Sequence, residues 1–171
     1  MTEGSRLAAL VEALLFVADE PVSVGRLAGA LDVSPAQVEE ALGELEAVLR
    51  ERGLRLQRMG DRCQLVTAPE AAPYVERLLE LGERRRLSQA ALETLAIIAY
   101  RHPISRPAIE AIRGVNCDSV LRTLLAAGLI EEAGRASAPG RPILYAPTFA
   151  FLQYFGLQRP EDLPPLETEV E

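Results

Sequence analysis

One segment of the sequence is repeated, and this repeat constrains the fold more than any other feature. Residues 13–42 align with residues 95–124 over 30 positions without a gap, at a constant offset of 82. Pro21 matches Pro103, and Ser23 matches Ser105. Apolar positions match too, in the pairs Leu15–Ile97, Phe16–Ile98, Val22–Ile104, Leu27–Ile109, Val33–Val115, Val38–Val120 and Leu42–Leu124. Self-similarity at this period indicates two copies of one domain.

Each copy predicts the same run of helices. Apolar residues recur at helical spacing, and the two matched prolines end the first helix because the residue before a proline avoids helical geometry. Ser23 and Ser105 then stand where N-cap residues belong, and Ser34 and Asn116 cap the third helices. The predicted helices are 5–19, 24–31, 35–52 and 69–81 in the first copy, and 88–101, 106–113 and 117–128 in the second.

After the third helix of each copy the apolar period changes from helical to two, which is typical of strands. Gly60 and Asp61 supply the turn of a first hairpin, and residues 134–140 form a longer loop between strands near 129–133 and 142–146. Three helices followed by a hairpin is the order of a winged-helix domain, with the second and third helices as a helix-turn-helix and the hairpin as the wing. The predicted fold is therefore mainly α with small β-hairpins, an α+β class.

The repeat and the charge distribution define the domain organisation. We expect a first winged-helix domain over 1–81, a linker over 82–87, a second winged-helix domain over 88–158 and a disordered acidic tail over 159–171, since the end of the chain is too polar to bury much surface. Residues 1–81 carry eight arginines against fourteen acidic residues, whereas residues 82–156 carry nine against six. The acidic first copy argues against contact with nucleic acid there.

Composition indicates a soluble cytoplasmic protein. Two cysteines in 171 residues are too few for a disulfide framework. No apolar run approaches the roughly 18 residues that a membrane span needs, and the first residues lack the basic leader of a signal peptide.

Neither catalysis nor metal binding is favoured. His102 is the one histidine of the sequence, and a general base needs an orienting partner and a nucleophile within reach. The nearby Ser105 is better explained as a helix cap, because Ser23 fills the same position of the other copy beside no histidine. Cys63 alternates inward on a strand, and Cys117 begins a helix, so both are expected to be buried thiols. With His102 they show no paired metal-ligand spacing, and we expect no cofactor.

Specific DNA recognition is the main alternative, because helix-turn-helix units often enter the major groove. The third helix of the first copy, however, holds five glutamates against two arginines, which phosphates would repel. The third helix of the second copy holds one acid, Asp118, and one base, Arg122. A winged-helix transcription regulator thus remains the alternative, and weak nonspecific DNA contact through the arginines of the second copy is the most that we expect.

Several segments of the second copy together carry a family resemblance: ALETLAIIAY (91–100), PISRPAIEAIRGV (103–115), LLAAGLIEEAGR (124–135), GRPILY (140–145), FLQYFGL (151–157) and EDLP (161–164). With these segments the chain resembles the segregation and condensation protein B (ScpB) family. The resemblance covers most of the chain and is densest over 87–164. It departs from the family in residues 145–148, where this chain has Tyr-Ala-Pro-Thr and the family usually has Tyr-Gly-Thr-Thr, so Ala146 and Pro147 differ.

The resemblance implies a non-enzymatic adaptor of the bacterial condensin complex. Members of the family pair as homodimers through their first domain and bind the kleisin ScpA, which bridges the heads of the Smc ATPase. The complex condenses and segregates chromosomes during cell division, so a nucleoid-associated protein of the cytoplasm is implied, with no membrane partner.

Two surfaces are candidates for these contacts. The first helix has more apolar residues than one buried face needs, and a self-complementary second face would suit a two-fold dimer. The aromatic run near residue 150 could likewise dock a partner, with arginines at the rim. The dimer candidates are Leu7, Leu10, Leu14 and Val17. The kleisin-binding candidates are Tyr100, Arg101, Arg106, Leu144, Tyr145, Phe149 and Phe151.

Overall fold

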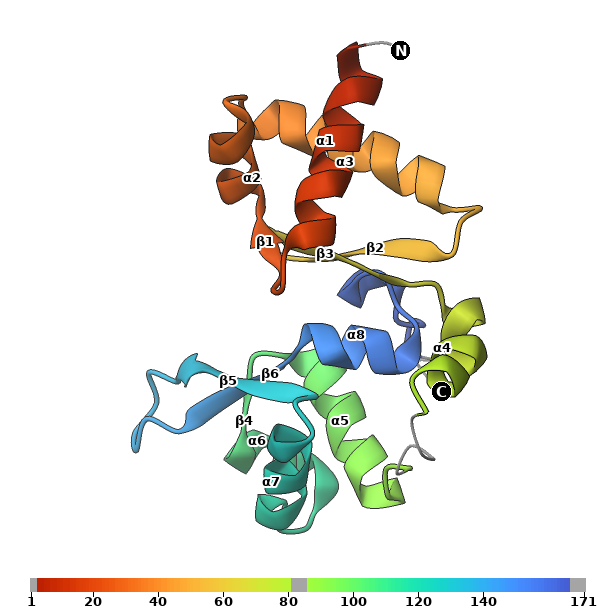
Figure 1. Ribbon diagram of the computed structural model, residues 1–171. Helices are drawn as coiled ribbons and strands as arrows, with labels where there is room; N and C mark the ends of the chain where they lie inside the picture. Colours follow the sequence, from red (N-terminus) through yellow and green to blue (C-terminus); the bar gives the residue numbers. More distant parts are fainter. Residues whose placement is uncertain (1–2, 81–85, 167–171) are drawn as a thin grey trace. The chain divides into compact units, whose positions relative to one another are not determined.

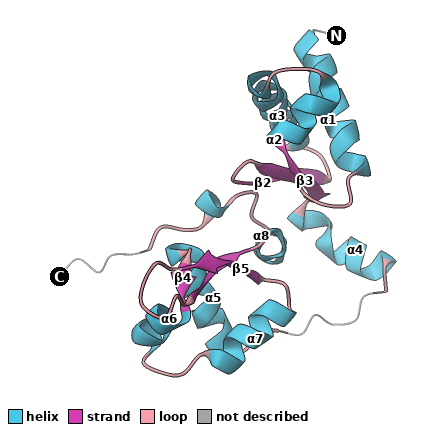
Figure 2. Ribbon diagram, turned by 90° about the vertical axis from the view of Figure 1, so that its left-hand side faces the viewer, coloured by secondary structure: helices cyan, strands magenta, loops and turns pink. Residues whose placement is uncertain are grey.

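A computed structural model describes residues 3–80 and 86–166. The chain divides into two compact units, Met1–Gly82 together with Gly156–Glu171, and Glu83–Phe155. Each unit combines helices with one three-stranded antiparallel sheet, so the chain is a mixed α/β protein, as the sequence predicts (Figures 1 and 2).

The first unit opens with three helices whose apolar faces meet. Val11 of the first helix and Val38 and Leu42 of the third are fully buried and belong to one hydrophobic cluster with Leu27 and Leu56. Burial of these side chains is the main force that holds the unit together. The helical elements are α1 (Glu3–Val17), α2 (Val24–Leu31), α3 (Pro35–Leu49), the 3₁₀ turn η1 (Pro69–Ala71) and α4 (Ala72–Leu78).

The sheet of the first unit has the strand order β1-β3-β2. Strands β2 (Leu54–Met59) and β3 (Arg62–Thr67) form the predicted hairpin. The two-residue strand β1 (Val22–Ser23) pairs with β3, with Val22 opposite Cys63. Strands β1 and β2 are therefore the two outer strands of the sheet, and one edge of β2 is not paired to another strand of the described residues.

The second unit repeats this order. Its helical elements are α5 (Gln89–Arg101), α6 (Arg106–Arg113), α7 (Asp118–Ala126) and α8 (Phe149–Phe155). Its strands are β4 (Ile104–Ser105), β5 (Ile130–Arg135) and β6 (Ile143–Pro147), in the order β4-β6-β5. The hairpin carries a register shift between Glu132 and Arg135, and it projects beyond the helices of its unit (Figure 1).

The structure confirms the repeat and corrects its alignment. Strands β1 and β4 and helices α2 and α6 begin and end 82 residues apart, as predicted. In the first helices, however, the buried faces match at an offset of 83, since Leu15 corresponds to Ile98 and both are buried. The predicted pair Phe16–Ile98 is wrong, because the connection from helix to strand is shorter in the second unit. Phe16 is 79% exposed.

Local capping explains where the helices begin. Ser34 accepts a hydrogen bond from the backbone N–H of Gln37, and the Gln37 side chain accepts one from the Ser34 N–H in return, which is a capping box. Ser23 accepts from the N–H of Arg26. The prediction that Asn116 is the N-cap of α7 is wrong by one residue: the N-cap is Cys117, which makes no side-chain cap bond, although Asn116 accepts from the N–H of Asp118. Ser105 stands at the N-cap of α6 without a side-chain cap bond.

The predicted boundaries differ from the observed ones at the end of the chain. The second domain was expected to reach residue 158, but the residues from Gly156 onward belong to the first unit. The expected disordered tail contains a described 3₁₀ turn, η2 (Pro160–Asp162), which hydrogen bonds within the segment hold in place. Most of the predicted linker 82–87 and the last five residues lie outside the described residues.

Candidate interaction surfaces

Helix α1 has an apolar face that its own unit leaves uncovered. Leu10 is 45%, Phe16 79% and Val17 71% exposed. Leu7 and Leu14 are half-buried and pack against the core of the unit. The sequence predicted four residues on this face, and the structure leaves only two of them, Leu10 and Val17, largely exposed. It adds Phe16, which the ungapped alignment had matched with a core isoleucine.

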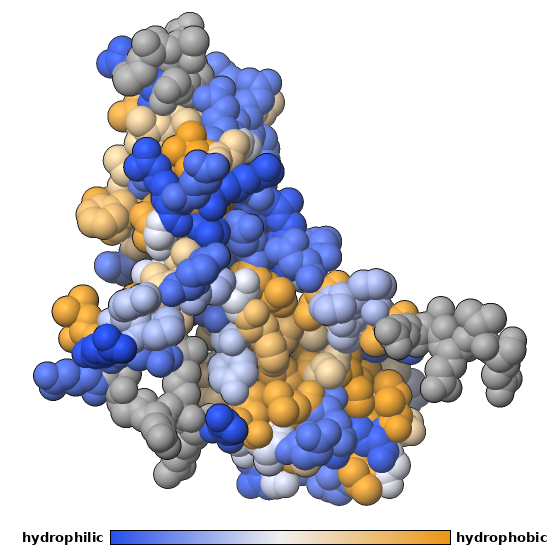
Figure 3. All heavy atoms as spheres, turned by 90° about the vertical axis from the view of Figure 1, so that its right-hand side faces the viewer, coloured by the Kyte–Doolittle hydropathy of each residue, from blue (hydrophilic) through white to orange (hydrophobic). Residues whose placement is uncertain are grey.

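Other apolar side chains are exposed at scattered positions. On the face drawn in Figure 3, apolar residues gather in patches among charged ones. Large side chains outside α1 that are more than half exposed are Val48, Tyr74, Leu78, Leu79, Ile112, Val115 and Leu166. Scattered apolar residues are normal on a protein surface, but exposed ones gather on two helical segments: Leu10, Phe16 and Val17 on α1, and Tyr74, Leu78 and Leu79 at α4.

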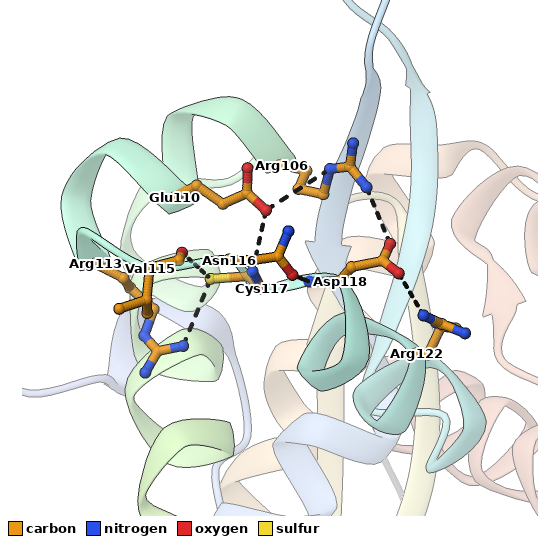
Figure 4. Close-up of polar contacts among 8 residues, drawn as sticks. All are labelled: Arg106, Glu110, Arg113, Val115, Asn116, Cys117, Asp118 and Arg122. Atoms are coloured by element: carbon orange, nitrogen blue, oxygen red, sulfur yellow. Dashed lines mark hydrogen bonds and ion pairs between the residues drawn. The ribbon is translucent and has the colours of Figure 1, made fainter.

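Helices α6 and α7 of the second unit are joined by a network of charged groups (Figure 4). The Arg106 guanidinium donates to Asp118 Oδ1 at 2.9 Å, and Arg122 pairs with the other oxygen of the same carboxylate. Glu110 Oε1 accepts from the backbone N–H of Cys117 at 3.0 Å. The hydrogen bonds from Arg122 and Arg106 lower the pKa of the Asp118 carboxyl below its ordinary value.

A second set of contacts fixes the turn between these two helices. Arg113 donates to Glu93 Oε2 at 3.1 Å and to the sulfur of Cys117 at 3.5 Å. The Cys117 thiol is buried and donates to the carbonyl of Val115. Arginines 106, 113 and 122 are thus each engaged by a carboxylate of their own unit, and a phosphate would have to compete with these partners.

The candidate kleisin-binding residues do not share one environment. Tyr145 is 8% and Phe151 2% exposed, so the prediction that they anchor a partner is corrected: both belong to the core. Alternate residues of β6 face inward, which buries Tyr145, and α8 turns Phe151 toward its unit.

The remaining candidates of the second unit reach the surface to different degrees. Tyr100, Leu144 and Phe149 are half-buried, and Arg101 is exposed. Arg106 is also exposed, although it is held by the carboxylates of the network. Phe155, which belongs to the predicted aromatic run but not to the candidate set, is 43% exposed, and its ring lies at a tilt to that of Phe151 with ring centroids 5.0 Å apart.

The cysteine and histidine side chains that could act in catalysis or bind a metal do not form one cluster, since Cys63 and His102 belong to different units. Cys63 is buried in the first unit, and burial raises the pKa of its thiol to about 11, so it stays protonated at neutral pH. His102 lies in the second unit, where its Nδ1 is 2.9 Å from the carbonyl oxygen of Ala99. Among the described residues no group of three or more histidine, cysteine or acidic side chains could hold a metal ion. None of the described helices has the length and apolarity to cross a bilayer.

Comparison with known proteins gives one consistent result. The family model for segregation and condensation complex subunit ScpB matches residues 9–166. Segregation and condensation protein B of Moorella thermoacetica is 52% identical over 166 residues, which are 96% of this chain and 85% of that protein. The protein of the same name from Geobacillus kaustophilus is 52% identical over 161 residues, 92% of this chain and 74% of that protein.

A solved structure of related sequence is a dimer of the ScpB N-terminal domain complexed with an ScpA peptide. It is 38% identical to this chain, covers 43% of it and 94% of that chain, and superposes with a TM-score of 0.40.

Fold and surfaces together define a class: a mixed α/β protein of two repeated units, each of three helices and a three-stranded sheet, with an uncovered apolar face on its first helix. The comparisons then fix the family. The chain belongs to the segregation and condensation complex subunit ScpB family.

Proposed function

We propose that this chain is a non-enzymatic adaptor of the bacterial condensin complex, built from two tandem winged-helix domains. It binds the kleisin ScpA, reaches the Smc ATPase through ScpA, and supports chromosome condensation and segregation during cell division in the cytoplasm. Membership of the ScpB family is the observation that carries this proposal, because 96% of the chain aligns with a family member at 52% identity. The order of three helices and a hairpin in each unit supports the winged-helix assignment.

The first domain is proposed to pair with a second copy through α1. The exposed face around Phe16 and Val17 supports this, because two copies related by a two-fold axis would cover it with the same apolar residues. An interface centred on an aromatic side chain of this kind concentrates its binding energy there.

The second domain is proposed to hold a segment of ScpA. Its half-buried candidates Tyr100, Leu144 and Phe149 offer apolar area, and Arg101 and Arg106 offer positive charge at the rim. Truncation of an apolar anchor to alanine commonly costs about 2 kcal/mol or more of binding free energy, while removal of a charged side chain at the rim costs less. Arg106 is expected to matter least, because carboxylates of its own domain already engage it.

A titration of ScpA with variants of the second domain tests this assignment. Phe149→Ala should weaken binding at least tenfold more than Arg106→Ala. Ile112→Ala is the matched control, since it removes an apolar side chain that is 53% exposed in the same domain but outside the candidate set. Melting curves of each variant separate lost contact from lost folding. Folded Phe149→Ala that binds ScpA with undiminished affinity would move the surface elsewhere.

A winged-helix DNA-binding regulator is the alternative. The helix-turn-helix order of the domains favours it, but the charges oppose it. Helix α3 holds four glutamates and no basic residue, and the arginine of α7 is paired with Asp118. A DNA site bound tightly and selectively at about 200 mM salt would support this alternative over the adaptor.

A further inference from the structure

The chain returns to its first unit after it has completed the second. Helix α8 ends at Phe155, and the following residues, Gly156–Leu163, lie against the outer edge of β2 and the end of α3. We call this segment the C-terminal arm. The arm makes three kinds of contact with the first unit: a backbone hydrogen bond, a hydrogen bond from a buried amide, and an ion pair.

The first contact is at the sheet edge. The backbone N–H of Arg58 donates to the carbonyl of Gln158 at 2.8 Å. Since β2 is an outer strand of the sheet, this bond satisfies a group that no other described strand pairs. Edge strands with such open groups are common binding sites for extended peptides.

The second contact is a buried amide. Gln57 is only 1% exposed, and its Nε2 donates to the carbonyl of Leu157 at 2.7 Å while its Oε1 accepts from Gln64. A buried polar side chain is stable only when its hydrogen bonds are made. The amide therefore points at the place where the arm presents a carbonyl oxygen.

The third contact is a charge pair. Arg159 Nη2 lies 2.7 Å from both carboxylate oxygens of Glu46, on α3. Both side chains remain partly accessible, at 35% for Arg159 and 23% for Glu46, so the pair can separate into water.

Hydrogen bonds within the arm support its docked shape. The Asp162 carboxylate accepts from the N–H groups of Gln158 and Arg159, each at 3.0 Å, which folds the segment into a fixed turn. At Gly156 the backbone has φ of +68°, and a Cβ there would lie 3.1 Å from the Pro69 side chain. A preorganised segment loses less entropy on docking.

We propose that Glu46, Gln57 and the outer edge of β2 form a peptide-docking surface, and that the C-terminal arm occupies it in cis as a detachable latch. The docked arm caps the edge of β2 and restrains the chain where it leaves α8, the helix that carries Phe149. The polar contacts to two backbone carbonyls of the arm, and between one pair of charged side chains, are contacts that water can replace. Release would expose the edge strand and an unpaired Glu46.

Charge reversal at the ion pair tests the proposal in the full-length chain. In Arg159→Glu the arm faces Glu46 with a like charge, and the amide of Arg58 should exchange with solvent at least about tenfold faster, as expected for loss of a charge-assisted contact. The double variant Glu46→Arg, Arg159→Glu restores the opposite charges and should restore the protection. Amides within α3 serve as the control for folding and should not change in either variant.

A free peptide distinguishes a docking surface from a merely packed tail. The peptide of residues 156–164 should bind the Arg159→Glu chain and protect its Arg58 amide again, whereas the same peptide with glutamate at position 159 should not. The wild-type chain should bind the peptide at least tenfold more weakly, because its own arm competes at an effective concentration near the millimolar range.

Three results would overturn the latch. The Arg58 amide could remain protected in Arg159→Glu, which would mean that the ion pair does not hold the arm. The peptide could fail to bind that variant, which would mean that no docking surface exists. The Arg58 amide of the wild-type chain could instead lose its protection from hydrogen exchange when the protein is diluted. The arm would then come from a second copy rather than from the same chain.

Discussion

Phe16 offers the sharpest test of the dimer surface. Its side chain is 79% exposed in the single chain. A phenylalanine buries about 150–250 Å² when fully covered, so about 120–200 Å² is available to a partner. At about 25 cal/mol per Å² this area is worth about 3–5 kcal/mol per protomer if it is wholly covered.

Phe16→Ala should weaken the dimer through this loss. Because the alanine keeps part of the contact and coverage is incomplete, we expect about 2 kcal/mol from each copy. A two-fold interface contains the Phe16 side chain of both protomers, and the substitution removes both. The dissociation constant of the dimer should therefore rise roughly a thousandfold. The stability of the monomer should change by no more than about 0.5 kcal/mol, since the side chain contributes little to the core.

Sedimentation equilibrium over a range of concentrations measures this directly. The matched control is Leu78→Ala, which removes a side chain that is 82% exposed in the same unit but lies on α4, and it should leave the dimer unchanged. A Phe16→Ala chain that dimerises like the wild type, or a wild-type chain that is monomeric at tens of micromolar, would refute the assignment of α1.

Three further predictions follow from burial and charge. Phe151→Ala should lower the free energy of unfolding by about 3–5 kcal/mol in a denaturant titration, because a fully buried ring is removed from the core; a loss below about 1 kcal/mol would contradict its burial. The Cys63 thiol, with its pKa raised by burial to about 11, contributes stability below its ordinary pKa of 9.0 and loses that contribution as the pH rises toward 11, so Cys63→Ala should flatten the fall in unfolding free energy over this window. Binding to duplex DNA should be unselective and should collapse with salt in a filter or anisotropy assay, whereas a selective site would contradict the paired arginines of α6 and α7.

Much of the fold could be predicted because the repeat multiplies each local signal. Helices α2 and α6 have the predicted bounds. A serine stands before each helix, and a residue whose backbone adopts the left-handed conformation follows it, Asp32 after α2 and Gly114 after α6. The strands β1 and β4 were missed, because two residues are too short to show a period. They also complete each sheet, and their pairing is a long-range contact that no local pattern encodes.

The surfaces were harder to predict than the elements. At the constant offset of 82, Phe16 pairs with Ile98. The connection from helix to strand, however, spans residues 18–21 in the first unit and only 102–103 in the second, and the two side chains lie in opposite environments. The sequence predicts Tyr145 and Phe151 as anchors because aromatic residues suit interfaces, but aromatic residues suit cores equally. The sequence assigns residues 156–158 of the arm to the second domain and residues 159–163 to a disordered acidic tail, whereas Asp162 accepts hydrogen bonds that fold the segment and Arg159 binds it to Glu46.

The adaptor role is tested most directly by native mass spectrometry of this chain mixed with ScpA from the same organism. The account predicts that the chain alone has the mass of two copies, that a complex containing two copies and ScpA forms on mixing, and that Phe16→Ala shifts both species toward a single copy. A wild-type chain that stays monomeric and takes up no ScpA would contradict the account.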